Sequence, residues 1–484
     1  MNLDSLQTWV ALLPELILSG MILLILLADL FLGHICRFIA YGLSQLTLIA
    51  LIVIGCIFLD HHIHGSYLNG QLNVTSLTIL LMIVISICNF FVFIYSRKYI
   101  EDHSMMRLEY YLLSLLSTLG AFVLVQALSL ITIFIGLELL SLPLYAMIAM
   151  RRNYLKGAEA SIKYLIMGAL ATAILLYGMS FVYGLTGSLN VTEIANALSN
   201  TSSDNHLLVL FSMILFILAV AFKLGAAPFH MWLPDVYDGS PNAVTAYLAS
   251  VPKVAGYGML IILTFHLLPA YGKYWADVLM IIGVLSILIG NTAALVQKNL
   301  KRMIGYSTVA HVGFVFLALS VGQTETMGLG AALYYVIVYV INAVAVFGII
   351  MILSKKGFEA ENLKDFAGLN QRHSWLAFMM LILFLSLAGI PPLAGFTIKL
   401  LVINVLMTNG AYYLAIFALI MSVIGAYYYL RVIRVVYFEK PETTDVIRPK
   451  ADALIAVSVN CLAILVFGVL PFYTTELIKL IYPY

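Results

Sequence analysis

The chain has 484 residues, of which 63% are hydrophobic and 10% are charged, and its net charge at pH 7 is +2. A mean hydropathy of +1.04 excludes a soluble protein, and no basic excess points to a nucleic-acid partner. We therefore expect a polytopic membrane protein whose main surroundings are the lipid bilayer.

Apolar runs separated by polar breaks predict an all-α fold of about fourteen transmembrane helices, because about 20 residues cross the hydrocarbon layer. The first run contains Glu15 and Asp29 and has no basic leader or cleavage site, so we interpret it as a retained span. We expect spans at 12–32, 38–59, 73–96, 109–126, 128–150, 156–184, 207–233, 242–268, 275–296, 302–321, 327–353, 375–408, 411–436 and 452–478.

The loops after odd-numbered spans carry most of the basic residues. Nineteen of the 25 Lys and Arg residues fall there, two fall in the opposite loops and four lie inside spans. The loop after span seven is the exception, because it contains Asp235 and Asp238. The positive-inside rule then places both termini on the outer side, which is the periplasmic side in a bacterial inner membrane.

The longest outer loop and the four cysteines give no sign of a catalytic or metal site. The longest outer loop, about 187–205, is polar and is expected to hold one short helix. The four cysteines are scattered in or beside apolar runs without a C-x-x-C or His/Cys cluster, so we expect small buried side chains and no metal or iron–sulfur site: Cys36, Cys56, Cys88 and Cys461.

Five ionisable residues stand inside predicted spans. They are Glu138, Lys163, Lys223, Lys253 and Lys399. A charge at the bilayer centre costs about 2.5–3.5 kcal/mol on insertion scales, and such residues usually face a wet interior. Four lysines and one glutamate without a cofactor motif indicate a path for protons.

Two spans contain helix-breaking residues near a lysine. Span seven reads AVAFKLGAAPFHMWLPD, with Pro228 five residues after Lys223, and span twelve reads LSLAGIPPLAGFTIKLL. A proline removes a helical N–H, and broken backbone at this depth is tolerated only inside protein or beside a wet cavity. Packing kinks are the alternative explanation.

The spacing of the breaks predicts an internal repeat. Spans 4–8 and 9–13 form two five-helix units, each with a broken fourth helix, and an odd helix number makes the second unit inverted. The expected divisions are an N-terminal segment at 1–107, a first repeat at 108–268, a second repeat at 269–438 and a C-terminal helix at 439–484.

Four segments carry a family resemblance: FIGLELLSLPLY at 134–145, AVAFKLGAAPFHMWLPDVYDGSP at 219–241, KNLKRMIGYSTVAHVG at 298–313 and AGIPPLAGFTIK at 388–399. Over most of its length the chain resembles the antiporter-like subunits of proton-pumping NADH:quinone oxidoreductase, respiratory complex I. The match is closest to subunit N, called subunit 2 in mitochondria and chloroplasts. A length of 484 argues against subunit L, and Lys399 argues against subunit M, which has a glutamate there.

The resemblance implies a proton relay through Glu138, Lys163, Lys223, Lys253 and Lys399. Glu138 would pair with Lys223 and tune it, and Lys399 would release the proton at the outer side. Two of these residues also have a specific structural explanation. Glu138 could form a static ion pair, and Lys163 could form an i,i+4 pair with Glu159.

Two histidines are added to this relay from their positions. His311 lies between two lysines, and His230 lies at the break in span seven. Imidazole can pass a proton through either nitrogen, although a lone buried histidine is often a hydrogen-bonded core residue. On span eleven the polar groups are Tyr335, Tyr339 and Asn342, so a path there needs water or these side chains.

The implied function is that of a proton-translocating subunit without redox chemistry of its own. FMN, iron–sulfur clusters and the quinone site would belong to partner subunits, and the contacts would be subunit M and the small K-, J- and A-type subunits. A subunit of a multisubunit Na⁺/H⁺ antiporter and a passive structural subunit remain as alternatives.

Overall fold

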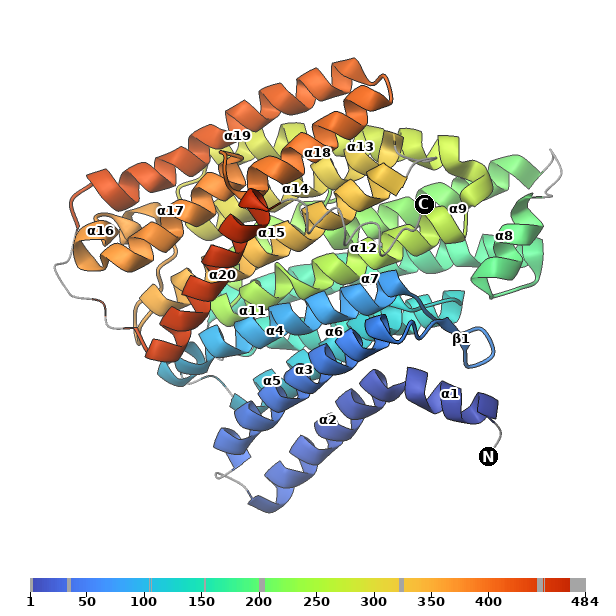
Figure 1. Cartoon of the computed structure of the whole chain (residues 1–484), viewed down its shortest axis with the longest axis horizontal. Coiled ribbons are helices and arrows are strands. Elements are labelled where there is room, and N and C mark those ends of the chain that lie inside the picture. Colours follow the sequence, from blue (N-terminus) through green and yellow to red (C-terminus); the bar gives the residue numbers. More distant parts are fainter. Residues whose placement is uncertain are drawn as a thin grey trace.

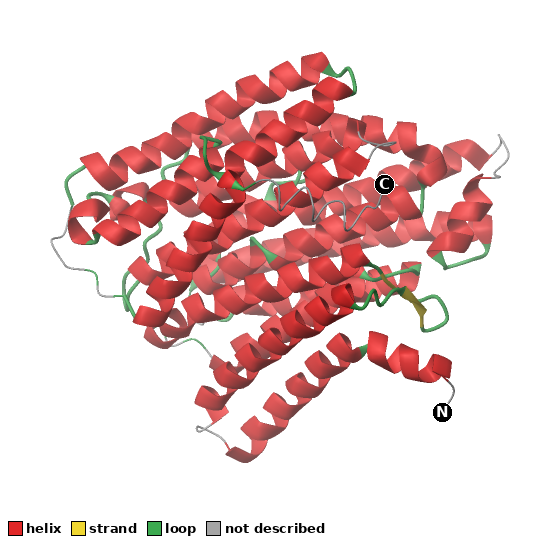
Figure 2. Ribbon diagram, in the orientation of Figure 1, coloured by secondary structure: helices red, strands yellow, loops and turns green. Residues whose placement is uncertain are grey.

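The computed structural model of the chain describes residues 3–32, 36–103, 105, 107–151, 154–199, 205–321, 326–441, 447 and 449–470. Figure 2 shows this part almost entirely as helix, with α2 and α19 at opposite edges of the molecule (Figure 1). The predicted all-α architecture is confirmed.

The first half of the chain contains twelve α-helices among its described residues. Their bounds are α1 (Leu3–Ala11), α2 (Leu13–Leu32), α3 (Cys36–Asp60), α4 (Ser76–Asp102), α5 (Arg107–Val125), α6 (Leu130–Ile148), α7 (Leu155–Thr186), α8 (Val191–Ser199), α9 (His206–Leu224), α10 (Trp232–Gly239), α11 (Asn242–Leu248) and α12 (Val251–Ile261). The short helix expected in the outer loop is α8.

The second half begins with a π-helical turn that extends α12. The bounds are η3 (Ile262–His266), the 3₁₀ turns η4 (Pro269–Tyr271) and η5 (Leu363–Phe366), α13 (Gly272–Val296), α14 (Leu300–Val321), α15 (Thr326–Leu353), α16 (Leu369–Arg372), α17 (Ser374–Ala388), α18 (Ala394–Thr408), α19 (Tyr412–Phe438) and α20 (Ala451–Val469).

Thirteen helical segments of the described chain are long and apolar enough to cross a membrane. The remaining predicted span, the twelfth at 375–408, is divided into α17 and α18, each of 15 residues. The predicted helix count and both predicted breaks are therefore confirmed. The last eight residues of the predicted span 452–478 lie outside the described residues.

Three local features were not expected. One is α1, and another is a two-stranded antiparallel hairpin, β1 (Gly65–Tyr67) and β2 (Leu72–Val74), between α3 and α4. The third is a division of span eight into α11 and α12 at Ala249 and Ser250, next to Pro252. One cysteine also differs, because Cys56 is exposed whereas Cys88 and Cys461 are buried. The side chain of Cys36 is outside the described part.

The loops gather at two ends of the helix bundle. At the end that we call the basic end, Glu359 contacts Arg151 and His103, and Lys450 contacts Glu101. At the opposite end, Asn73 contacts Gln126, and Leu130 contacts Leu189, through backbone hydrogen bonds. The predicted alternation of the loops is confirmed for these segments, while the predicted repeat and segment boundaries stay predictions. Arg152, Arg448 and Lys479, which entered the charge count, lie outside the described residues.

Candidate functional site

The first break ends α9 through a left-handed glycine. Gly225 has φ +81°, a conformation that costs a side-chain-bearing residue energy, so glycine is required here. The amide of Ala226 bonds the carbonyl of Ala221 at 2.8 Å, and that of Gly225 bonds Phe222 at 3.0 Å. This is the Schellman pattern, which leaves the final carbonyl of α9 available.

The second break repeats this ending. Gly389 has φ +83°, and the amide of Ile390 bonds the carbonyl of Leu385 at 3.1 Å while that of Gly389 bonds Ser386 at 2.9 Å. Both breaks also contain a cis X-Pro bond, at Pro228 and at Pro392. Gly225 and Gly389, which are 164 residues apart in the sequence, therefore end their helices in the same way.

Lysine ammonium groups bind the free carbonyls at both breaks. Lys253 Nζ donates to the carbonyl of Leu224 at 2.8 Å. Lys399 Nζ donates to Leu387 at 2.9 Å and to Ala388 at 3.0 Å. The C-terminal end of a helix favours a cation. Because Lys399 lies two turns past the break in the sequence, its position alone predicts no gain from the helix dipole. That expectation is wrong, because its side chain folds back onto the end of α17.

Lys223 lies in the last turn of α9 and is buried, as predicted. Its Nζ donates to Ser141 Oγ at 2.7 Å. Glu138, one turn earlier on α6, accepts from Thr172 Oγ1 at 2.7 Å. The described residues thus contain no direct ion pair between Glu138 and Lys223. Each of the two side chains binds a hydroxyl group instead.

Two stacked aromatic rings lie between Lys223 and Lys253. Tyr164 and Trp232 stack with centroids 4.5 Å apart. Lys223 Nζ lies 6.0 Å from the Tyr164 ring, and Lys253 Nζ lies 5.2 Å from the Trp232 ring. Such cation–π contacts stabilise a desolvated ammonium group. The two lysines are therefore close enough to influence each other without touching.

His311 occupies a buried cluster of tyrosines on the far side of Lys253. Its Nδ1 lies 2.7 Å from the hydroxyl of Tyr335 and its Nε2 lies 3.0 Å from that of Tyr429. Tyr429 also contacts Ser307. A cavity of about 20 Å³ lies between Lys253, His311 and Tyr335. It has room for one water molecule, and its accessible lining is apolar.

His230 has no contact with the buried lysines among the interactions of the described residues. It is buried at the break after α9, its Nδ1 has no hydrogen-bond partner among the described residues, and its ring centroid lies 6.2 Å from that of Tyr306. Lys223 and Lys253 flank one aromatic pair, and Lys253 and His311 line one cavity.

Lys163, which the sequence places inside a span, is not buried. Its side chain is 44% exposed and pairs with Glu159 at 2.7 Å and with Asp235 at 3.1 Å. The reason is its place near the start of α7, from which the long side chain reaches α10 at the basic end. The i,i+4 pair anticipated from the sequence is present, and exposed pairs of this kind stabilise by about 0.3–0.5 kcal/mol.

A pocket of about 160 Å³ opens beside Lys163. Asp235 lies on its wall and also bonds Arg302 at 2.7 Å. Partial burial raises the pKa of Asp235, but the bonds from Arg302 and Lys163 outweigh it and hold the pKa below its ordinary value. The acidic segment that stood out among the basic loops is thus matched by cations from α7 and α14.

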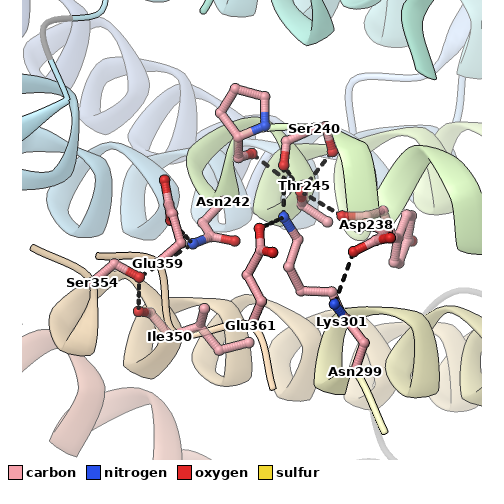
Figure 3. Close-up of polar contacts among 12 residues, drawn as sticks. Asp238, Ser240, Asn242, Thr245, Asn299, Lys301, Ile350, Ser354, Glu359 and Glu361 are labelled. Atoms are coloured by element: carbon pink, nitrogen blue, oxygen red, sulfur yellow. Dashed lines mark hydrogen bonds and ion pairs between the residues drawn. The ribbon is translucent and has the colours of Figure 1, made fainter. Parts of the chain in front are cut away.

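Lys301 is a buried lysine that the sequence analysis placed in a loop. Its side chain is 1% exposed in the first turn of α14. Figure 3 shows its Nζ between the carbonyl of Ser240 at 2.7 Å and Glu361 Oε1 at 3.5 Å. Beside it, Glu359 accepts from Asn242 at 2.7 Å. The charge count alone gave no sign of this burial, because the KNLKR run reads as a loop.

Two hydroxyl partners were also missed. Ser141 follows Glu138 by three residues and so shares its helix face, which is a signal that the sequence does contain. Thr172 approaches Glu138 from α7, and only the packing of α6 against α7 reveals that contact. Among the described residues, no group of three or more His, Cys, Asp or Glu side chains is placed to hold a metal ion.

Comparison with known proteins agrees with this geometry. Residues 127–425 match the family model described as NADH:quinone oxidoreductase/Mrp antiporter, TM. NADH-quinone oxidoreductase subunit N of Francisella tularensis subsp. holarctica is 44% identical over 462 residues, which cover 95% of each chain.

Solved structures show the same fold. A chain of respiratory complex I from Thermus thermophilus with bound aureothin is 28% identical, with a TM-score of 0.80, and the match covers 96% of this chain and 98% of that one. A chain of the Mrp complex from Dietzia sp. DQ12-45-1b, with 99% and 98% covered and a TM-score of 0.84, is 18% identical and shows the fold alone. The chain therefore belongs to the subunit N family of NADH-quinone oxidoreductases, within the antiporter-like membrane proteins.

Proposed function

We propose that this chain moves protons across the membrane as one subunit of an NADH:quinone oxidoreductase. The observation that supports this most is the pair of broken helices whose final carbonyls hold the ammonium groups of Lys253 and Lys399. An ammonium group between helix ends and apolar side chains can be loaded and unloaded by small changes around it.

The proposed order of transfer follows the middle of the bundle. Lys223 takes up a proton from the inner side, and Lys253 receives it next. Water in the cavity between Lys253 and His311 carries it to the tyrosine cluster, and Lys399 releases it outward. Glu138 controls the first step by exchanging Thr172 for Lys223. Lys163 acts at the inner mouth, beside Asp235, and His230 stays a weaker candidate.

The driving reaction belongs to other subunits in this proposal. NADH oxidation at FMN, electron transfer through iron–sulfur clusters and quinone reduction occur in partner chains, and this chain carries no redox group. Its neighbours are subunit M and the small K-, J- and A-type subunits. The basic end faces the cytoplasm, so both termini lie on the periplasmic side. Labelling of Lys356→Cys and Ser66→Cys variants with an impermeant maleimide tests this, since only the second should react from outside.

Alanine variants of Lys223 and Lys399 test the relay. In assembled complex reconstituted into vesicles, each should abolish or strongly reduce proton pumping driven by NADH, whereas Lys356→Ala, on an exposed loop, should not. Complex content is measured by bound flavin so that failed assembly is not mistaken for failed pumping. Normal pumping in both lysine variants would favour a passive structural subunit.

The Na⁺/H⁺ antiporter remains the second candidate because the matching family model includes Mrp antiporters. Lys399 and the close relatedness to subunit N chains favour the oxidoreductase. Purification of the tagged chain in mild detergent decides between the two. NADH:quinone reductase activity and flavin in the eluate support the oxidoreductase, and an intact assembly without either supports the antiporter.

A further inference from the structure

One face of α14 carries a row of buried polar side chains from the basic end to the middle of the bundle. Lys301, Thr308 and His311 are spaced at i, i+7 and i+10, which places them on one helix face. All three are buried. Only His311 belongs to the relay proposed above, so the function of the other two is open.

The part of this row that lies near the middle of the bundle is linked to α15 by hydrogen bonds. Thr308 Oγ1 lies 2.7 Å from the hydroxyl of Tyr339 on α15, and His311 Nδ1 lies 2.7 Å from that of Tyr335. The rings of His311 and Tyr339 are 5.3 Å apart, and both line the cavity of about 20 Å³ described above. A water molecule that enters this apolar cavity during turnover would complete the link from Tyr339 to His311, since the volume has room for one.

The other half begins at the surface of the basic end. Glu361 is 15% exposed and Lys301, next to it, is 1% exposed. A carboxylate at the surface beside a buried ammonium group gives a proton two successive holding points. Figure 3 shows the two side chains meeting under the short helices that follow the first break.

Two unpaired polar atoms occupy the gap between these halves. Asn342 lies one turn from Tyr339 toward the basic end, on the same face of α15, and its Oδ1 has no hydrogen-bond partner among the described residues. The fully buried hydroxyl of Tyr237 on α10 faces Thr308 and Tyr339 but completes no well-directed hydrogen bond. Buried polar atoms in such positions are usually satisfied by water.

We propose that Lys301, Asn342, Tyr237, Thr308 and Tyr339 form a second, hydrated proton entry that leads from the inner face to His311. This rests on the proposed function and adds a route to it. Lys301 receives one proton from Glu361 and releases one to water in the gap. Each hydroxyl then accepts one proton and donates one, and His311 gains the proton at the end. Tyr237 opens or closes the route by joining or leaving the hydroxyls of Thr308 and Tyr339.

Two substitutions interrupt the gap while keeping its shape. Tyr237→Phe removes the hydroxyl, and Asn342→Leu replaces the amide by an apolar group of similar size. In assembled complex in vesicles, each should slow the share of NADH-driven proton uptake that uses this entry by about 2- to 10-fold, the effect of one lost hydrogen bond on a transfer barrier, while the entry through Lys223 continues. Thermal unfolding should change no more than it does in the control below, since Asn342→Leu removes one hydrogen bond, from Nδ2 to the carbonyl of Val338 at 2.8 Å, and the Tyr237 hydroxyl completes no well-directed bond. Tyr95→Phe is the matched control, a buried tyrosine whose hydroxyl bonds Asn460 away from the route.

Substitutions at Lys301 distinguish a role in proton transfer from a purely structural role. Arginine keeps the charge and the donors but does not release a proton in proteins. Lys301→Arg should therefore keep the contacts with Ser240 and Glu361 and assemble normally, yet slow proton uptake as much as Lys301→Met does. Full rescue by arginine would show that Lys301 only holds the loop in place, and would overturn this part of the route.

The outcomes distinguish this inference from the proposed function. If Lys223→Ala and Lys399→Ala stop pumping while Tyr237→Phe and Asn342→Leu pump at the rate of Tyr95→Phe, the second entry is wrong and the main relay stands. If the first two variants pump normally, the proposed function fails. Slower uptake in all four, with normal unfolding, supports both.

Discussion

The two interrupted spans share a helix ending but differ in the source of the cation that binds it. At the first break the ammonium group comes from a different span, since Lys253 reaches across from α12 to Leu224. At the second it comes from the same span, since Lys399 on α18 folds back to Leu387 and Ala388. A helix end thus fixes where a buried cation is stabilised, and the chain can supply that cation in more than one way.

The first break has a further cation that the second lacks. Lys223 stands one residue before the end of α9, and the residue in the same place before the end of α17 is Leu387. Conversely, the residue eleven positions after the end of α17 is Lys399, and the one eleven positions after the end of α9 is Asp235. The first region therefore holds two buried lysines and a partly exposed acid, which fits the proposed loading step, and among the described residues the second holds Lys399 alone, the proposed exit.

The largest expected effect on pumping comes from replacing Lys253 and Lys399, the lysines that bind the helix-end carbonyls, by arginine. Arginine keeps a cation on the free carbonyls but does not release a proton. Lys399→Arg and Lys253→Arg should both assemble, and pumping should fall by about 10²- to 10⁴-fold, the usual contribution of a proton-transfer group. Pumping by reconstituted complex measures this. Normal pumping by Lys253→Arg alone would show that Lys253 has only a structural role at the first break. The two breaks would then have different functions.

A smaller effect on stability and pumping is expected from substitution of the two helix-ending glycines, Gly225 and Gly389. Gly225→Ala and Gly389→Ala each force a side chain into the left-handed region, which costs roughly 1–2 kcal/mol of unfolding free energy. The added Cβ at 389 also falls 2.9 Å from Lys399 Cδ, whereas that at 225 meets Leu233. Only Gly389→Ala should therefore displace a relay lysine and reduce pumping beyond the loss of stability.

Gly410→Ala provides the matched control for these glycines. Its φ is +74° and an added Cβ meets nothing within 4 Å, so it should show the backbone cost alone. Thermal unfolding in detergent and pumping are measured for all three variants. Equal pumping by the 389 and 410 variants would contradict the packing argument.

The smallest effect concerns Asp235, which stands where the second region has Lys399. Its pKa in the folded chain lies below the ordinary value of 3.8, so the ionised form stabilises the fold at pH above that value. This contribution is lost as the pH falls through the lower, folded pKa. After solvent screening it amounts to about 0.2–1 kcal/mol, because the pair is partly exposed.

Asp235→Asn checks this pH dependence. The variant should lose stability at neutral pH and lose less than the unmodified chain when the pH is lowered from about 5 through the folded pKa of Asp235, which lies below 3.8. Unfolding temperatures across that range measure the difference. Parallel curves for the two proteins would mean that Arg302 and Lys163 do not stabilise the carboxylate.

Much of the architecture was predictable from the sequence. The predicted spans coincide with helices because membrane thickness demands long apolar runs, and this requirement is local in sequence. Gly225 and Gly389 mark helix ends for an equally local reason, since the αL conformation suits glycine. Burial of Lys223, Lys253 and Lys399 followed from their positions within apolar runs.

Other parts of the site were not predictable in this way. Lys163 lies inside an apolar run and is exposed, whereas Lys301 lies in a basic run and is buried. Local composition cannot settle either case, because burial depends on which helices pack nearby. Lys301 contacts Ser240 at the end of α10 and Glu361 in the loop after α15, both of which are distant from it in sequence.

The sequence by itself determined the fold class, the two breaks and the set of lysines inside the apolar runs. Each of these follows from hydrophobic length or from the conformational preference of one residue. Only the tertiary structure decided which carbonyl each ammonium group binds, that Lys223 bonds Ser141 instead of Glu138, and that α14 and α15 share a buried polar face. These are contacts between helices, and a side chain's partner across such an interface is set by packing rather than by its neighbours in the chain.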